Sequence, residues 1–456
     1  MKHRFFTALL AGCLLLAAGC TREIPEDVQR SLEAKFSSSR PESSSAPEGT
    51  GGNLDPDEEV PPEDSASDIF HEPVISTAVF KAVGDNLIHN TIYLQAQSRA
   101  TGEQKYDFYP AYEKIAPLLE GADFAFINQE TLLASAVFEP SNYPKFNSPT
   151  EVGDTMRELG FNLFAHANNH ALDMGVKGIN ATLDYWDNKE GLGEDFLVTG
   201  LFRDEADMNR VRVMEKNGIS LALVAFTEHT NGLKLPDTVD NKIIYTKDIE
   251  TIKRQIETAR EAADVVVVSV HWGIENSHEV VDAQKELAQQ MFDWGADIIL
   301  GTHPHVLQPI EPMTSSDGTR KGYIIYSLGN FISAQNVPDN LVGGILEFAI
   351  EKNMDTGEIS IGKPSLTPIV THYETAWQKN LTLYPLADYT DELADVHGVK
   401  TMRNGYPSFS VEYIWNMLDD TIGEEYLQRE LPAPPEGEED EGEENGGSEG
   451  EPQASA

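Results

Sequence analysis

The stretch D-V-V-V-V-S-V-H at residues 264–271 and the stretch D-I-I-L-G-T-H-P-H at residues 297–305 are the clearest indications of the fold class. Each contains a short, nearly continuous apolar run, which is typical of a strand buried on both faces. Residues 282–294 between them have the length and apolar spacing of a helix. A helix between two buried strands indicates an α/β fold in which helices cover a sheet.

The same pattern recurs along the chain of 456 residues, of which 40% are hydrophobic. Further strands are predicted at residues 74–84, 123–128, 161–168, 219–226 and 323–331, and further helices at residues 176–188 and 248–263. Two strand-like stretches flank a polar turn within residues 343–374, and residues 404–431 are predicted to close with a helix. This last part either extends the sandwich or forms a small lid.

Polar side chains follow the apolar runs at the point where each predicted strand ends. They are Asp85, Glu130, Asn169, His170, His271, His303 and His305. In open α/β sheets this edge is where ligands bind, so we expect the side chains to converge in one cleft. Carboxylate, carboxamide and imidazole groups are suitable ligands for Mn, Fe, Zn or Mg, and a carboxylate that bridges two ions would create a two-metal site.

Each of these residues, taken singly, also fits a structural role. Asp85 and Asn169 are residue types that commonly cap turns and helices, and His271 follows a buried strand where a core histidine is equally expected. The pair His303 and His305, separated by one proline, is less easily explained without a ligand. The chain has two cysteines, both within the first twenty residues, so the predicted cleft contains no thiolate ligand.

Six short motifs occur in a fixed order. They are Gly84-Asp85, Asn128-Gln129-Glu130, Asn168-Asn169-His170-Ala171-Leu172-Asp173, His271-Trp272-Gly273, Gly301-Thr302-His303-Pro304-His305 and Ser327-Leu328-Gly329-Asn330-Phe331. Together they resemble the CapA family of capsule-synthesis proteins linked to poly-γ-glutamate, which is similar to the calcineurin-like metallophosphoesterases. The resemblance covers about residues 77–334, more than half of the chain.

This resemblance implies a four-layer α-β-β-α sandwich, with a C-terminal strand and helix extension, and a site for two divalent metal ions. The implied metal ligands are Asp85 and His305 for one ion, Asn169, His271 and His303 for the other, and Glu130 as the bridge. His170 would stay off the metal and donate a proton or hydrogen bond, and Asp173 would orient it. Asn330 would contact substrate.

The sequence departs from the wider phosphoesterase pattern at two positions. The first motif there is Asp-x-His, whereas Asp85 is followed by Asn86 and Leu87, and Glu130 stands where the second motif has aspartate. The first metal is therefore short of one expected ligand. We do not expect His89, four residues beyond Asp85, to replace it, and weak occupancy or a single metal is an alternative to two.

The N-terminus has the pattern of a targeting signal. A basic start, Met1–Arg4, precedes an apolar run too short for an ordinary membrane span, which ends in Leu16-Ala17-Ala18-Gly19-Cys20. This ending resembles a bacterial lipobox, so we predict that Cys20 is lipidated; a cleaved secretory signal and an uncleaved anchor are the alternatives. The predicted layout is a signal at 1–20, an acidic Ser/Pro/Gly tether at 21–73, the metal-binding domain at 74–339, an extension packed on it at 340–429 and an acidic tail at 430–456.

The formal net charge of −43 limits the possible partners. It argues against nucleic acid, since binding there depends on Lys and Arg contacts to phosphate. Two functions remain: a surface-anchored, metal-dependent hydrolase or transferase acting on a cell-envelope polymer such as poly-γ-glutamate or on a phosphorylated precursor, and a non-catalytic factor that binds the polymer or membrane synthase subunits. Both place the protein on the extracytoplasmic face of a bacterial membrane, held by its lipid anchor.

Overall fold

The computed structural model describes residues 73–403 and 405–431. The predicted lipidation site Cys20, the signal before it and nearly all of the two acidic segments lie outside these residues. Within the described part, none of the helices has both the length and the hydrophobicity that crossing a bilayer requires.

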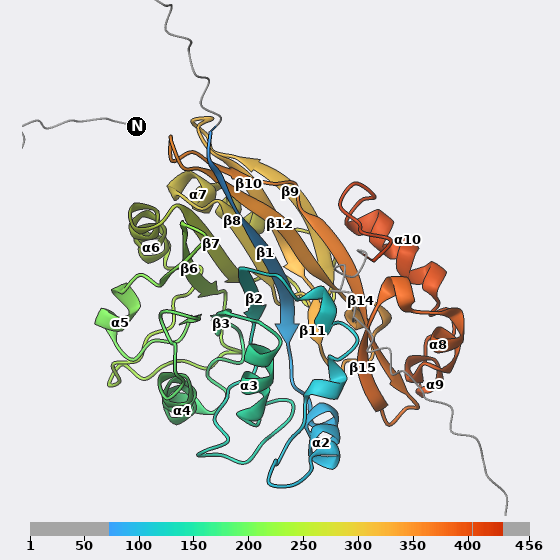
Figure 1. The fold of residues 1–456 in the computed structure, drawn as a ribbon. Helices are drawn as coiled ribbons and strands as arrows, with labels where there is room; N and C mark the ends of the chain where they lie inside the picture. The colour runs from blue at the N-terminus through green and yellow to red at the C-terminus, as the bar shows by residue number, and fades with distance from the viewer. Residues whose placement is uncertain (1–72, 404, 432–456) are drawn as a thin grey trace, which may run out of the picture. The chain divides into compact units, whose positions relative to one another are not determined.

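The first sheet, shown in Figure 1, is built around the long central strand β1 (Ile75–Asn86). Its strand order is β15-β14-β12-β1-β2-β3-β4. The other strands in this order are β2 (Phe124–Asn128), β3 (Leu163–Ala165), β4 (Leu197–Thr199), β12 (Val342–Asn353), β14 (Ser365–Glu374) and β15 (Lys379–Pro385). Two short strands, β11 (Asn330–Ile332) and β13 (Ile359–Ile361), pair with β1 and β12. Strands β1 to β4 are parallel, so their carboxyl ends share one edge.

The second sheet has the order β5-β6-β7-β8-β10-β9. Its strands are β5 (Val213–Lys216), β6 (Ile219–Thr227), β7 (Val265–His271), β8 (Ile298–Thr302), β9 (Leu307–Thr314) and β10 (Lys321–Leu328). Strands β6, β7, β8 and β10 are parallel, which brings the ends of the two stretches at 264–271 and 297–305 next to each other.

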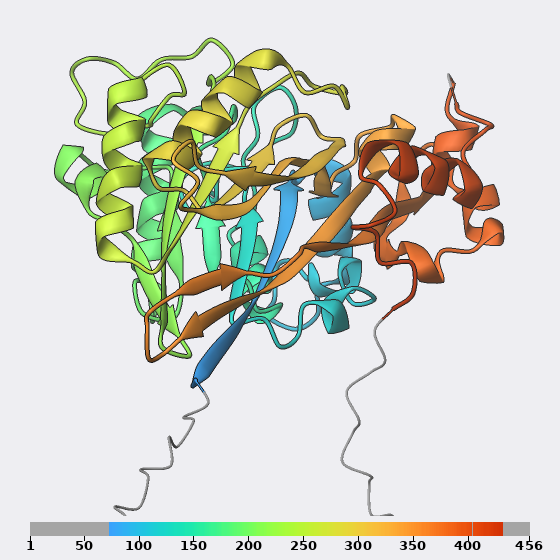
Figure 2. The same cartoon turned by 90° about the horizontal axis from the view of Figure 1, so that it is seen from above.

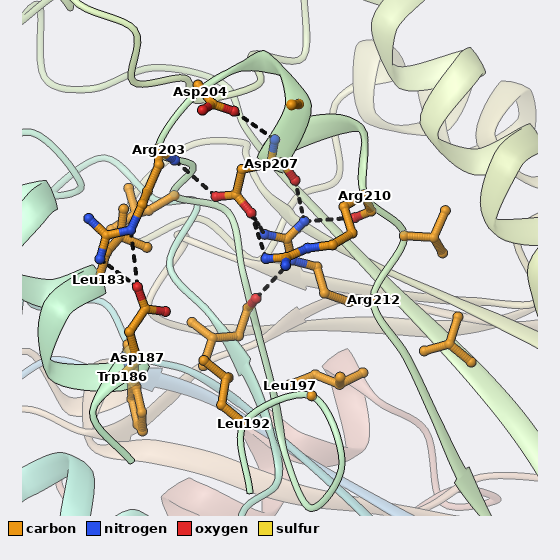
Figure 3. A pocket seen from close by; sticks show the side chains of 16 residues that line it. Leu183, Trp186, Asp187, Leu192, Leu197, Arg203, Asp204, Asp207, Arg210 and Arg212 are labelled. Carbon is orange, nitrogen blue, oxygen red and sulfur yellow. Dashed lines mark hydrogen bonds and ion pairs between the residues drawn. The ribbon is translucent and has the colours of Figure 1, made fainter. Parts of the chain in front are cut away.

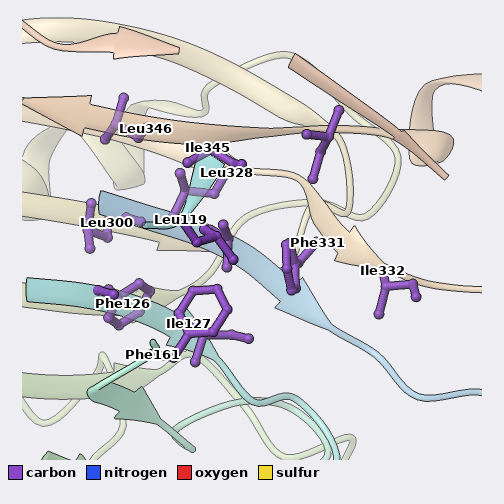
Figure 4. Packing of buried hydrophobic residues seen from close by; sticks show 14 of the residues in the cluster. Leu119, Phe126, Ile127, Phe161, Leu300, Leu328, Phe331, Ile332, Ile345 and Leu346 are labelled. Atoms are coloured by element: carbon purple, nitrogen blue, oxygen red, sulfur yellow. The ribbon is translucent and has the colours of Figure 1, made fainter. Parts of the chain in front are cut away.

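The two sheets share one apolar core. Figure 4 shows Phe126 of β2 in the same cluster as Leu300 of β8 and Leu328 of β10. Strand β7 explains the run of valines: Val265 and Val267 belong to this core, and Val266 and the other alternate residues belong to a second cluster beneath the helices. Because side chains alternate along a strand, a strand buried on both faces must be apolar throughout.

Helices cover both outer faces (Figures 1 and 2). On the second sheet these are α6 (Ile249–Ala262) and α7 (Asp282–Trp294), whose Ile252, Ile256, Met291 and Phe292 pack with the alternate valines of β7. On the first sheet they are α2 (Asn90–Arg99), α3 (Glu151–Glu158) and α4 (Gly175–Asp187), and Trp186 of α4 lies 4.6 Å from Phe164 of β3 between ring centroids. The predicted four-layer α-β-β-α sandwich is therefore confirmed.

The predicted strand at 323–331 is in fact two strands that belong to different sheets. Strand β10 ends at Leu328, Gly329 takes φ +65°, and β11 then pairs with β1 so that Asn330 lies beside Asp85. A Cβ atom on Gly84 would lie 1.8 Å from the carbonyl oxygen of Gly329, so glycine is required for this close approach. The chain thus passes from one sheet to the other directly beside the predicted metal ligands.

The C-terminal part extends the sandwich, which answers the alternative left open by the sequence. Strand β12 pairs antiparallel with β1, and the predicted hairpin forms from β12, β13 and β14. Beside β14 and β15 lie three helices, α8 (Asp391–Val396), α9 (Gly398–Thr401) and α10 (Val411–Thr421), as Figure 1 shows. Ile414 and Leu418 of α10 are buried in the main core, so this part is not a separate lid.

The remaining described helices are short. They are α5 (Glu205–Asn209), η1 (Tyr109–Ala111), η2 (Ala116–Leu118), η3 (Pro338–Leu341) and η4 (Leu386–Asp388).

Candidate metal centre

Asp85 is the second-last residue of β1 and is fully buried, and both of its carboxylate oxygens have polar partners. Its Oδ1 accepts a hydrogen bond of 2.7 Å from Nδ2 of Asn128, the residue that ends β2. Its Oδ2 accepts from the backbone N–H of His303 at 3.2 Å and lies 3.1 Å from Nδ1 of His305. The carboxylate therefore connects the ends of two strands in the first sheet with the histidine loop of the second.

Glu130 is the buried side chain that most needs a compensating positive charge. Its side chain is buried, and within the described residues neither carboxylate oxygen has a hydrogen-bond partner. Oε2 lies 3.8 Å from Nδ1 of His305, and Oε1 lies 3.8 Å from Nε2 of His271. Burial and the neighbouring Asp85 raise the pKa of Glu130 well above its ordinary value. A buried carboxylate is costly without a compensating charge, and a divalent cation would supply one.

Three side chains form a compact group suitable for one ion. One ligand atom each from Asp85, Glu130 and His305 can be chosen so that all three lie within 4.8 Å of one another. Two carboxylates and an imidazole fit a hard or borderline divalent cation. The predicted ligands of the first ion are therefore brought together.

A second group lies on the other side of Glu130. Nε2 of His271 lies 3.1 Å from Oδ1 of Asn169, and its Nδ1 lies 2.9 Å from the hydroxyl of Thr302. The ring of His303 lies 4.7 Å from that of His271, and its Nδ1 is buried without a hydrogen-bond partner among the described residues. These are the residues predicted for the second ion, and Glu130 lies between the two groups.

The loop that carries the two histidines has an unusual backbone. His303 has φ +99° and His305 has φ +60°, a region that residues other than glycine rarely occupy. Such conformations persist where the surrounding structure holds them and are frequent at functional sites. The loop places both imidazoles against the carboxylates of the first sheet.

Burial and neighbouring charges shift the pKa values of the site histidines in opposite directions. Burial, together with the neighbouring histidines, lowers the pKa of His303 to about 2 and that of His271 well below its ordinary value. Both are therefore neutral at physiological pH, the form that binds metal ions. For His305, Glu130 and Asp85 outweigh burial and raise the pKa to about 9.

His170 and Asp173 form a separate pair. Nδ1 of His170 lies 2.7 Å from Oδ2 of Asp173, which also accepts a 2.7 Å hydrogen bond from the N–H of Phe146. The Phe146 ring packs edge-on against the imidazole at 4.7 Å between centroids. The expected orienting contact is present, and the catalytic role of the pair stays a prediction.

Asn330 begins β11 and is buried within a dense polar network. Its Oδ1 lies 3.1 Å from Nδ1 of His305. Its Nδ2 donates to Ser333 Oγ, Gln335 Oε1 and the carbonyl of Asn340, at 3.0, 2.7 and 2.9 Å. The predicted contact between Asn330 and substrate stays a prediction.

Two residues beside the site were not among the predicted site residues. Asn128 holds Asp85, and His229 lies with its ring 5.1 Å from that of His303. Asn128 ends β2 of the first sheet and His229 follows β6 of the second, so the rule that found the other residues, the end of an apolar run, also applies to them. His89 lies outside the three-residue group, as expected, and its Nδ1 lies 3.2 Å from the backbone nitrogen of Ala334.

A pocket of about 750 Å³ lies elsewhere, between α4, β4, α5 and β5 (Figure 3). Several of its charged side chains form ion pairs: Arg212 Nη2 lies 2.7 Å from Asp207 Oδ1, and Arg203 pairs with Asp187. None of the predicted metal ligands lines it.

The sequence profile described as "Bacterial capsule synthesis protein PGA_cap" matches residues 79–335, a range that includes all the residues of the metal centre. The chain belongs to this family. The resemblance to the CapA family that the motifs suggested is thereby confirmed.

Two relatives carry capsule-related names. The PGA biosynthesis protein CapA of Bacillus subtilis (strain 168) is 30% identical over 270 residues, covering 58% of this chain and 66% of that protein. The capsule biosynthesis protein CapA of Bacillus anthracis is 28% identical over 279 residues, covering 57% and 63%. In both cases the match spans less than two thirds of the relative's own length.

Two solved structures show a more distant likeness. A phosphatase from Mycoplasma pneumoniae has a TM-score of 0.37 and 14% identity, covering 65% of this chain and 95% of that one. A putative 5′-nucleotidase from Staphylococcus aureus has a TM-score of 0.40 and 13% identity, covering 76% and 58%. At these scores neither likeness bears on the activity of this chain.

Proposed function

We propose that this member of the family is a hydrolase or transferase that depends on divalent metal and acts on a cell-envelope polymer, poly-γ-glutamate or a phosphorylated precursor, in capsule synthesis. The observation that carries the proposal is Glu130, a buried carboxylate that receives no hydrogen bond from the described residues and lies between two groups of metal-ligand side chains. The names of the two bacillar relatives support the polymer.

The residues present fit a pair of divalent ions. Asp85 and His305 would hold one, Asn169, His271 and His303 would hold the other, and Glu130 would contact both. Ions bound there would supply Lewis-acid chemistry, polarising a phosphoryl or carbonyl oxygen and lowering the pKa of water.

The chain's own proton donor is His170. Asp173 accepts from Nδ1, so the imidazole is fixed in one orientation and Nε2 is left to carry the proton that is given to a leaving group. Phe146 restricts the ring from one side, which keeps the pair away from bulk water. His170 would therefore act as a general acid held by Asp173.

The same centre would reduce the electrostatic barrier to an anionic polymer. A chain with a net charge of −43 repels a polyanion at long range. Bound divalent cations would be the largest local charges in the site and would attract carboxylate or phosphate groups at short range. Lipidation at Cys20 would hold the protein at the membrane surface, where membrane synthase subunits would deliver the polymer.

A non-catalytic role in polymer binding or synthase assembly is the second candidate. It is favoured by Leu87, which stands where the wider phosphoesterase pattern has a metal-binding histidine and is itself buried. A centre with fewer ligands would bind metal and substrate less firmly and turn over less, or not at all.

The test uses the full chain with elemental analysis of bound metal, followed by assays with phosphodiesters and γ-glutamyl peptides in added Mn²⁺. We expect bound metal and turnover in the wild type and loss of both in the variant His303→Ala plus His305→Ala. His372→Ala is a matched control, because His372 is a buried histidine of β14 whose ring bonds to Tyr389. Absence of metal from the wild type would refute the enzyme proposal. Polymer binding that persists in the double variant would favour the assembly role.

A further inference from the structure

Asn330 is a neutral side chain whose oxygen lies beside a predicted ligand of the first metal position. Its Oδ1 lies 3.1 Å from Nδ1 of His305, and that same nitrogen lies 3.1 Å from Oδ2 of Asp85. Oε2 of Glu130 lies 3.8 Å from it on a further side. Three potential ligand oxygens therefore lie within 3.8 Å of this one nitrogen.

The backbone fixes this placement. Asn330 is the register partner of Asp85 in the parallel pairing of β11 with β1, and Asp85 N–H donates to the carbonyl of Gly329 at 2.9 Å. On the other side, a Cβ atom on Gly343 would lie 2.0 Å from the carbonyl oxygen of Asn330. Two glycine contacts, at Gly84 and Gly343, thus allow neighbouring strands to enclose Asn330 closely.

The orientation of the Asn330 amide is also determined. Nδ2 donates to Ser333 Oγ, Gln335 Oε1 and the carbonyl of Asn340, and all three are acceptors in this arrangement. The opposite assignment of the amide would place the oxygen against the Asn340 carbonyl and the Gln335 oxygen. The nitrogen end is therefore held by the protein, and the oxygen end points to the metal position.

We propose that Asn330 is a metal ligand, and that its Oδ1 completes the first metal position together with Asp85, Glu130 and His305. This inference rests on the proposed function, because it requires that the centre binds metal. A small hard cation in octahedral geometry has bonds of about 2.0–2.1 Å, so its adjacent ligand atoms lie about 3 Å apart. The two separations of 3.1 Å at His305 Nδ1 agree with that spacing.

Asn330 would also account for the incomplete first motif. Leu87 cannot bind metal, and His89 is directed to the backbone of Leu87 and Ala334. Asn330 reaches the first metal position from β11, the strand that begins directly after the chain passes from the second sheet to the first at Gly329. With three oxygen ligands and one nitrogen, the position should accept Mn²⁺ or Mg²⁺, because oxygen ligands suit these harder cations.

The test combines diffraction and titration with Mn²⁺ as the probe. In crystals of the wild type soaked with Mn²⁺, we expect an anomalous peak within about 2.5 Å of Asn330 Oδ1, and a distance beyond about 3 Å would overturn the proposal. In calorimetric titrations, Asn330→Ala should weaken Mn²⁺ binding by about tenfold or more, since even residues that only orient ligands contribute about 10–100-fold.

Asn330→Asp separates a ligand from a structural anchor. Aspartate keeps the oxygen but cannot donate to Ser333, Gln335 and Asn340, so the variant should be less stable while it binds Mn²⁺ at least as tightly as the wild type. A loss equal to that of the alanine variant would overturn the proposal. Ser333→Ala removes one of the three acceptors that hold the Asn330 amide, so it should weaken Mn²⁺ binding by less than Asn330→Ala does. An equal loss in the two variants would show that anchoring explains the effect, and it would overturn the proposal.

Measurements on the wild type also distinguish a failure of the metal-dependent function from a failure of the Asn330 assignment alone. If it binds no Mn²⁺ in crystal or solution, the metal-dependent function fails and the assignment of Asn330 fails with it. If Mn²⁺ lies on Asp85, Glu130 and His305 but not on Asn330, only the assignment of Asn330 is overturned.

Discussion

Replacing Glu130 with glutamine should have opposite effects on stability with and without metal. In the metal-free protein, Glu130 is a buried carboxyl group beside Asp85, and burial together with that neighbour raises its pKa well above the ordinary value, so its ionised form is costly in the folded state. Glu130→Gln removes the cost of ionising this buried group. The variant should then be more stable than the wild type, because the unpaired carboxylate costs free energy in the folded state.

The magnitude follows from burial and from ligand binding. A buried polar group without a partner costs about 1–3 kcal/mol, which is the gain expected for the metal-free variant. For a ligand at 100 times its dissociation constant, binding stabilises the wild type by about 2.7 kcal/mol. With an unfolding entropy of roughly 0.75 kcal/mol/K for a folded unit of this size, the metal should raise the wild-type Tm by about 4 °C, and glutamine should raise the metal-free Tm by about 1–4 °C.

The assay is thermal unfolding by circular dichroism, at fixed protein concentration and pH 7.5, in chelator and in excess Mn²⁺. We expect the variant to be the more stable protein in chelator and the less stable one in Mn²⁺, because it gains little from the ion. His372 is distant from the carboxylates in sequence and its Nδ1 is hydrogen-bonded to the hydroxyl of Tyr389. The variant His372→Ala should therefore lose the same stability in chelator and in Mn²⁺. A variant that is less stable than the wild type in chelator, or that keeps the full Mn²⁺ shift, would refute the reasoning.

Three further predictions concern single contacts. The hydrogen bond that Nε2 of His278 donates to Asp339 raises the pKa of His278 despite its burial, so this pair stabilises the fold below pH 6.5 and the stabilisation is lost as pH rises through the raised pKa. His278→Gln should therefore cost about 1 kcal/mol at pH 6 and less at pH 9, measured by urea unfolding. Asp173→Asn should lower kcat by roughly 10²–10⁴-fold and leave Mn²⁺ affinity unchanged, because it releases His170 but touches no predicted ligand; an equal loss of metal would contradict this. Gly84→Ala should destabilise the protein by about 3 kcal/mol or more, since the new Cβ meets a backbone oxygen at 1.8 Å, and normal thermal stability would disprove the close approach.

The sequence predicted the layers well because hydrophobic periodicity is a local signal. The continuous apolar run of β7 requires cover on both faces, and helix α7 was predicted with the bounds that the structure has. Short strands such as β4, with only three residues, carry too little pattern to be recognised. Their existence depends on neighbouring strands that the local sequence does not reveal.

The site was predicted as a set of residues, and its internal arrangement was not. The apolar runs show that Asp85, Glu130 and His271 lie at or just after the carboxyl ends of strands, but not that these strands belong to two sheets or which atoms face one another. Asn330 illustrates the limit. Its stretch was read as one strand, because nothing local indicates that Gly329 transfers the chain to the other sheet. The orientation of its amide follows from Ser333, Gln335 and Asn340, whose positions depend on that transfer.

The metal centre takes its predicted ligands from both sheets, so metal binding and folding should depend on each other. Asp85 and Glu130 come from the first sheet, and His271, His303 and His305 come from the second. An ion that binds ligands from both layers would act as a cross-link between them. Both cysteines lie within the first twenty residues, so no disulfide can join the two layers in the described part of the chain. Ligand loss from either sheet should therefore weaken metal binding and also the association of the layers, and the free energy of metal binding should appear as cooperativity between the two sheets during unfolding.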